Sequence, residues 1–168
     1  MAQQMGLEEA LDIAMDAELR AQAFYAQAAI QVLDPKGRDL LSRLASFEQY
    51  HYRKLAELAQ SLEEGEGFIG YEAQSMAGVE PFQGSGEAAG TQVAEMQDEA
   101  AILTAAIDNE RTASERYRAL AEQTKDADGK AMFNRLAYEE EMHQRILEDE
   151  FYALSNQGTW AWSGLYGE

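Results

Sequence analysis

Both histidines of this 168-residue chain lie in the same short pattern, in which a glutamate stands three positions before the histidine. The two tetrads are Glu48–His51 and Glu140–His143. Residues three apart lie on one face of a helix, so the carboxylate and the imidazole of each tetrad can reach one metal ion together. Glutamate-rich helices also produce such tetrads on their exposed faces, so a single tetrad would be interpreted as surface charge.

The tetrads belong to an internal repeat. Residues 7–62 align with residues 99–154 without a gap, and about a third of the aligned positions are identical, including the glutamate and the histidine of each tetrad. The repeat also pairs two further glutamates, Glu18 and Glu110. Each of these lies as far before a predicted turn as its tetrad lies after it, so in two antiparallel hairpins all six side chains reach the same height.

The elements that would carry these residues are long helices. Apolar residues recur at threes and fours between breakers, which predicts four helices near residues 5–33, 35–62, 95–125 and 127–154. Asp34 before Pro35, and Asp126, are suitable helix caps. The glycine-rich stretch of about 64–94 is predicted to cross between the hairpins. The order predicts an all-α four-helix bundle over residues 1–155, with an aromatic tail at 156–168.

A layer of four buried glutamates requires cations. Without them the carboxylates would be costly to bury, and some would stay protonated. Two divalent ions balance four negative charges, while the two imidazoles bind as neutral ligands. Oxygen-rich ligation with one nitrogen per ion suits iron or manganese better than a closed structural zinc site.

This ligand pattern resembles the ferritin-like di-iron carboxylate superfamily, and within it the chain is most similar to rubrerythrin-like proteins. The resemblance implies a ferritin-like bundle with two iron ions, with manganese or zinc as alternatives. It implies that Glu18 and His51 serve one iron, that Glu110 and His143 serve the other, and that Glu48 and Glu140 bridge them. It also implies oxidation of Fe(II) by peroxide or dioxygen, and a homodimer.

Two features depart from the rubrerythrin pattern. The chain has no cysteine, whereas full rubrerythrins carry a four-cysteine rubredoxin domain that delivers electrons, so turnover would need an external electron donor. Rubrerythrins also carry an additional glutamate one turn before the ligand of the third helix, where this chain has Ile107. A symmetric six-ligand centre is therefore the simpler expectation.

Two tyrosines accompany the ligand glutamates. Tyr25 and Tyr117 each follow a candidate ligand by seven residues and share its helix face. They are interpreted as donors that orient a carboxylate on a neighbouring helix, with an ordinary core tyrosine as the alternative.

Other acids near the tetrads are expected to face solvent. Asp16 and Asp108 point away from the ligand face and are interpreted as outer-face charge or interhelical contacts rather than as ligands. Glu139 and Glu141 flank Glu140 on other faces and are predicted to be solvated.

The tail holds both tryptophans of the chain, Trp160 and Trp162, together with Tyr166. It is expected to fold back on the bundle or on a dimer mate. The alternative is a docking peptide for another protein.

The composition limits the partners. With 31 Asp and Glu against 13 Lys and Arg, the formal net charge is −18, which disfavours nucleic acid and anionic membrane surfaces. No apolar run is long enough to span a membrane, and no secretory signal is visible. We therefore expect a cytoplasmic protein.

Three functions follow as hypotheses. The first is a di-iron oxidoreductase, a peroxidase or ferroxidase. The second is iron binding or storage without turnover. The third is an acidic helical scaffold that binds a partner through its tail.

Overall fold

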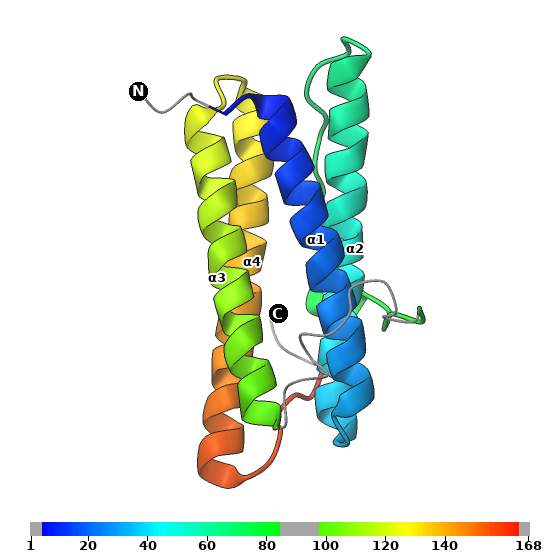
Figure 1. The fold of residues 1–168 in the computed structure, drawn as a ribbon, viewed down its shortest axis with the longest axis vertical. Helices are drawn as coiled ribbons and strands as arrows, with labels where there is room; N and C mark the ends of the chain where they lie inside the picture. Colours follow the sequence, from blue (N-terminus) through cyan, green and yellow to red (C-terminus); the bar gives the residue numbers. More distant parts are fainter. Residues whose placement is uncertain (1–4, 85–97, 165–168) are drawn as a thin grey trace.

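The computed structural model describes residues 5–84 and 98–164, which form four long helices and one short 3-10 helix. The helices are α1 (Leu7–Gln31), α2 (Pro35–Glu63), α3 (Glu99–Gln123) and α4 (Ala127–Gln157), and the 3-10 helix η1 is Met76–Gly78. α1 packs along α2 and α3 along α4, so that two hairpins lie side by side (Figure 1). The predicted all-α four-helix bundle is confirmed.

Aspartate side chains cap the starts of α2, α3 and α4, whereas α1 begins after Gly6 without a side-chain cap. The Asp34 carboxylate caps α2, with Pro35 at the first helical position, and Asp126 caps α4. Asp98 caps α3 in the same way. At the other end of α4, Gly158 takes a left-handed conformation (φ 72°) that favours glycine. The predicted start of the third helix, at residue 95, lies outside the described residues.

The described part of the crossover runs back along α2 (Figure 1). The Tyr50 hydroxyl donates to the carbonyl of Glu72 at 2.6 Å, and the Ser46 hydroxyl donates to that of Glu80 at 2.7 Å. These bonds fix residues 72–80 beside the middle of the bundle. None of the described helices is long and apolar enough to span a membrane.

Two apolar clusters fill the bundle, one at each end. One includes Phe24, Leu44, Leu103 and Leu147, and the other includes Leu11, Leu58, Tyr117 and Phe133. Along every helix the candidate ligands stand between residues of the first cluster and residues of the second. The hydrophobic burial that holds the helices together therefore also seals the ligand layer from both ends.

The tail folds back on the bundle, as one of the two interpretations expected. Trp160 and Trp162 are both buried, and their indole N–H groups donate to Glu99 at 2.8 Å and to Asp39 at 2.7 Å. Tyr166 lies outside the described residues.

Gly37 and Gly129 are equivalent in the repeat, and an aromatic ring from a segment outside the repeat packs against each of them. A Cβ added at Gly37 would lie 2.7 Å from the Trp160 ring, and one added at Gly129 would lie 2.5 Å from the Phe68 ring. Gly37 lies in the first turn of α2 and Gly129 in the first turn of α4. Both hairpins are therefore closed at the turn by a ring that only glycine admits.

We predict that Gly37→Ala destabilises the protein by about 1–3 kcal/mol, because the rigid Trp160 ring must move. The expected change in stability is opposite to the usual one, because replacing a helical glycine by alanine normally stabilises a protein by up to about 1 kcal/mol. Urea unfolding followed by tryptophan emission measures both the stability and the exposure of the indole. Gly70→Ala is the control, because its added Cβ meets nothing within 4 Å. A Gly37→Ala variant as stable as wild type would contradict the close packing of the Trp160 ring against Gly37.

Candidate metal centre

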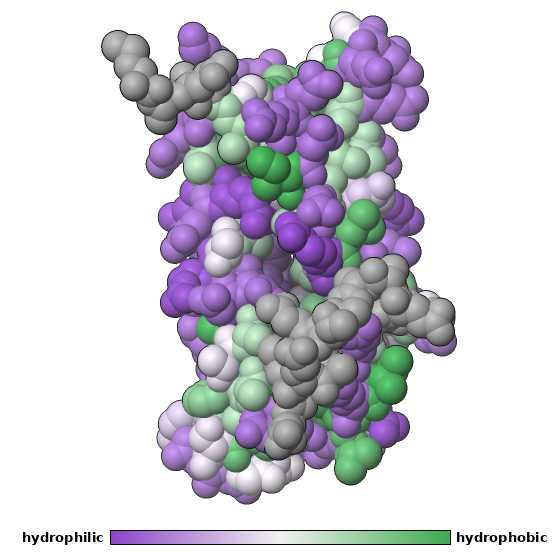
Figure 2. Space-filling view, in the orientation of Figure 1, coloured by the Kyte–Doolittle hydropathy of each residue, from purple (hydrophilic) through white to green (hydrophobic). Residues whose placement is uncertain are grey.

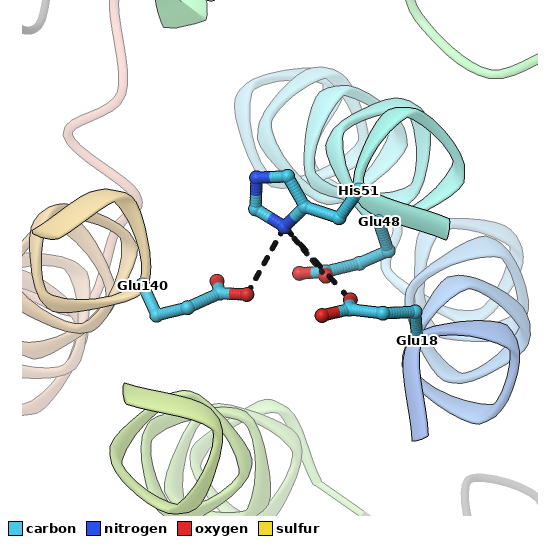
Figure 3. A group of neighbouring side chains, drawn as sticks. All are labelled: Glu18, Glu48, His51 and Glu140. Atoms are coloured by element: carbon cyan, nitrogen blue, oxygen red, sulfur yellow. Dashed lines mark hydrogen bonds and ion pairs between the residues drawn. The ribbon is translucent and has the colours of Figure 1, made fainter. Parts of the chain in front are cut away.

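The six candidate ligands meet in one buried layer at mid-bundle. Glu18 comes from α1, Glu110 from α3, and each tetrad from α2 or α4, and none of the six residues is more than 2% exposed. Figure 3 shows Glu18, Glu48 and Glu140 converging on His51 from three helices. Equal distance from the turns thus brings together side chains that lie up to 125 positions apart in the chain.

The ligand atoms form two overlapping sets. In one set, atoms of Glu18, Glu48, His51 and Glu140 all lie within 4.8 Å of one another. In the other, atoms of Glu48, Glu110, Glu140 and His143 do the same. Glu48 and Glu140 belong to both sets, which is the arrangement that two bridged ions need.

Both imidazoles present Nδ1 to the carboxylates. Nδ1 of His51 lies 3.0 Å from Glu140 and 3.6 Å from Glu48, and Nδ1 of His143 lies 3.2 Å from Glu140 and 3.8 Å from Glu110. The two rings are stacked with their centroids 6.1 Å apart. Nδ1 is therefore the nitrogen available to an ion in each set.

The layer perturbs the pKa values of its acids in opposite directions. Burial, together with the charges of Glu140, Glu110 and Glu18, raises the pKa of Glu48 well above its ordinary range. Burial and Glu140 raise the pKa of Glu110 to about 8. Burial would raise the pKa of Glu140 as well, but the flanking His51 and His143 hold it well below its usual value. Without metal the layer thus retains protons that binding of a cation would displace.

The donor set fits divalent metal. Oε1 of Glu48 is fully buried and has no hydrogen-bond partner among the residues that the structure describes. Such an orphaned carboxylate oxygen is costly unless a cation faces it. Four carboxylates and two imidazole nitrogens also match iron or manganese in softness.

The two tyrosines cross between the hairpins. The Tyr25 hydroxyl donates to Glu110, and the Tyr117 hydroxyl donates to Glu18. Each bond ties α1 to α3 and holds one oxygen of a candidate ligand, leaving the other oxygen free to face the centre.

The prediction that Glu139 is solvated is wrong. Its side chain is nearly fully buried, and Oε2 lies 2.9 Å from Nε2 of His51 and accepts from the Tyr71 hydroxyl at 2.5 Å. The helical wheel places Glu139 away from the ligand face, but α2 and the crossover cover that side of α4. Tyr71 lies in the irregular crossover, where helical spacing predicts no neighbours. Neither Tyr71 nor Glu139 was therefore predicted from the sequence to lie near the ligands.

The remaining acids behave closer to expectation. Asp16 and Asp108 are exposed and pair with Arg20 and Arg111, which confirms their place on the outer face. Glu141 is partly exposed and pairs with Arg118 of α3, so its prediction holds in part.

A cavity of about 240 Å³ opens between α1 and α3 and reaches the centre. Its inner wall includes Glu18, Glu48 and Glu110, and its outer part includes Ala21 and Ala113, which are equivalent in the repeat. Neither histidine lines it. On this face, shown in Figure 2, hydrophilic side chains gather around mid-height. Among the described residues, the imidazoles thus lie on the α2/α4 side of the layer, while the cavity opens the α1/α3 side to a small molecule.

A buried layer of four glutamates and two histidines in a four-helix bundle is the site of ferritin-like carboxylate proteins. The sequence model of the rubrerythrin family matches residues 1–59 and 101–159, so this chain belongs to that family. A solved structure of a hypothetical protein from Pyrococcus furiosus is similar, with a TM-score of 0.71 and 24% sequence identity, covering 93% of this chain and 94% of that one. At this identity the likeness shows the fold alone. No curated protein gives a significant match. Family and cluster together indicate a metal-binding protein.

We predict that Glu48→Gln makes the metal-free protein more stable than wild type at pH 7, because burial and the neighbouring acids raise the pKa of Glu48. The folded state holds the Glu48 proton more tightly than the unfolded chain does. Wild-type stability therefore falls as the pH rises above the ordinary value of 4.5 toward the raised folded pKa. Glutamine has nearly the same size and does not ionise, so its stability does not fall in this pH range. The unfolding free energies of the two proteins should therefore converge near pH 4.

Urea unfolding with a chelator at both pH values measures this difference. Glu63→Gln, on an exposed position of the same helix, is the matched control and should change the stability by less than about 0.5 kcal/mol. A Glu48→Gln protein that is less stable than wild type at pH 7 would show that the layer is not electrostatically strained.

Proposed function

We propose that this protein is a di-iron oxidoreductase that oxidises Fe(II) while reducing hydrogen peroxide or dioxygen. The observation that carries the proposal is the pair of overlapping, buried ligand sets that share Glu48 and Glu140. In this proposal Glu18 and His51 hold one iron, Glu110 and His143 hold the other, and the two shared glutamates bridge them.

Two irons supply two one-electron steps, which is the requirement for reducing one peroxide molecule to two water molecules with two protons. The residues of the chain position the ligands, exclude bulk water and admit the oxidant. Tyr25 and Tyr117 hold the terminal glutamates in place through the bonds described above. The apolar clusters at both ends exclude bulk water from the layer. The cavity between α1 and α3 admits the oxidant on the side opposite the imidazoles.

The electrons for further turnover come from outside this sequence. It contains no cysteine and therefore cannot bind a rubredoxin-type iron. We propose an external reductant that restores the ferrous state after each oxidation. Iron binding or storage without turnover remains the competing function, because it uses the same ligands.

Anaerobic loading with Fe(II) tests the function. We expect two ions per chain and, after addition of peroxide, the near-ultraviolet absorption of a diferric pair. Glu140→Gln should lose most of both ions, because Glu140 belongs to both sets. Glu141→Gln, one residue away and paired with Arg118, should retain both.

Repeated cycles with added reductant separate the alternatives. Continued peroxide consumption supports an oxidoreductase, whereas a single stoichiometric oxidation supports storage. Retention of two ions by Glu140→Gln would contradict the bridged arrangement.

The cavity generates a further prediction. Ala113→Leu fills its outer part, so the reaction with peroxide should slow by about tenfold or more while the iron content stays at two. Overpacking costs about 1–3 kcal/mol of stability, which unfolding measurements would detect. Ala119→Leu, at an exposed position of α3, is the control. Stopped-flow absorbance measures the rate, and an unchanged rate in a folded Ala113→Leu protein would mean that the oxidant enters elsewhere.

A further inference from the structure

The two halves of the layer are related by the sequence repeat but are not alike around the histidines. His51 and His143 are equivalent in the repeat, as are Phe47 and Glu139. An aromatic ring thus occupies in one half the position that a carboxylate occupies in the other. Both residues are buried against the imidazoles.

His51 has a carboxylate behind it. Nδ1 points to Glu140 and the other candidate ligands, and the second ring nitrogen points away from them (Figure 3). That nitrogen, Nε2, lies 2.9 Å from Oε2 of Glu139. Once an ion occupies Nδ1 in place of its hydrogen, the remaining ring hydrogen would lie on Nε2 and be donated to the Glu139 carboxylate.

Glu139 is itself held in place. The Tyr71 hydroxyl donates to the same Oε2, and Nε of Arg135 lies 3.6 Å from Oε1. Tyr71 belongs to the crossover, which has no counterpart in the repeat. This contact is therefore available to only one half of the bundle.

His143 has an aromatic neighbour instead. The Phe47 ring meets it edge-on with the centroids 4.6 Å apart. Among the residues that the structure describes, no carboxylate is hydrogen-bonded to Nε2 of His143. Within the described part of the chain, this imidazole therefore has no carboxylate at its remote nitrogen to strengthen it as a ligand.

We infer that Glu139, fixed by Tyr71, is a positioning residue that makes the two metal positions unequal, so that the position of Glu18 and His51 binds its ion more tightly and fills first. This rests on the proposed two-metal site. A carboxylate bonded to the remote nitrogen of a histidine ligand fixes the ring and increases its basicity, and losing such a partner typically costs about 10–100-fold in metal affinity.

Stepwise titration of the chelator-treated protein with Co(II), a spectroscopic substitute for Fe(II), tests the inference. Wild type should bind two ions in two resolved steps. Glu139→Gln should weaken the first step by about 10–100-fold and leave the second within about threefold, so that the steps merge. Tyr71→Phe keeps the carboxylate and should weaken the same step by a smaller factor. Glu141→Gln is the matched control and should titrate as wild type.

Proton NMR of the protein with one Co(II) per chain adds a readout that a general loss of stability would not produce. Wild type should show one hyperfine-shifted imidazole N–H that exchanges slowly with water, and Glu139→Gln should lose that slow exchange. Wild type binding two ions in one unresolved step, or Glu139→Gln titrating like Glu141→Gln, would overturn the inference while leaving the two-metal site intact. Wild type that binds no Co(II) would overturn the inference and the proposed function together.

Discussion

The burial of four glutamates in one layer is the constraint on which the rest of this structure depends. Carboxylates removed from water are unstable unless cations, protons or hydrogen-bond donors compensate them. Here the compensation is local: two imidazoles flank Glu140, and two tyrosine hydroxyls reach Glu18 and Glu110 across the bundle. One oxygen of Glu48 remains without a described partner. The described side chains therefore do not fully compensate the buried acids, and the proposed pair of divalent ions would balance the charge of the four glutamates.

The apolar parts of the bundle hold this strained layer together. Each helix contributes to both clusters, so hydrophobic burial on both sides keeps the carboxylates at the same height despite their repulsion. Two aromatic rings that pack at the hairpin turns also help to hold the helices in register. Trp160 over Gly37 and Phe68 over Gly129 pin the turn end of each hairpin, and the register of the ligands follows from their distance to those turns.

Much of this arrangement was predictable from sequence because it is periodic. The repeat, the helices and the six-residue layer all follow from spacing along a helix and from distance to a turn. Glu139 and Tyr71 were not predictable in the same way. The burial of Glu139 depends on how α4 is rotated against α2, and the position of Tyr71 depends on where an irregular crossover lies. No periodic pattern predicts the burial of Glu139 or the position of Tyr71. The symmetric six-ligand centre that the resemblance implies includes neither residue.

These same residues break the symmetry that duplication would otherwise leave. Glu139 adds a fifth buried carboxylate beside the four of the ligand layer, on the side of His51 only. With iron bound as proposed, Glu139 would add negative character to the nearer metal position through the imidazole, and negative character stabilises a ferric ion more than a ferrous one. In the proposed di-iron centre, two ions with unequal surroundings would differ in reduction potential, so one ion would be oxidised more readily than the other. In this proposal the crossover, through Tyr71, would influence the chemistry of a layer to which its described residues contribute no ligand.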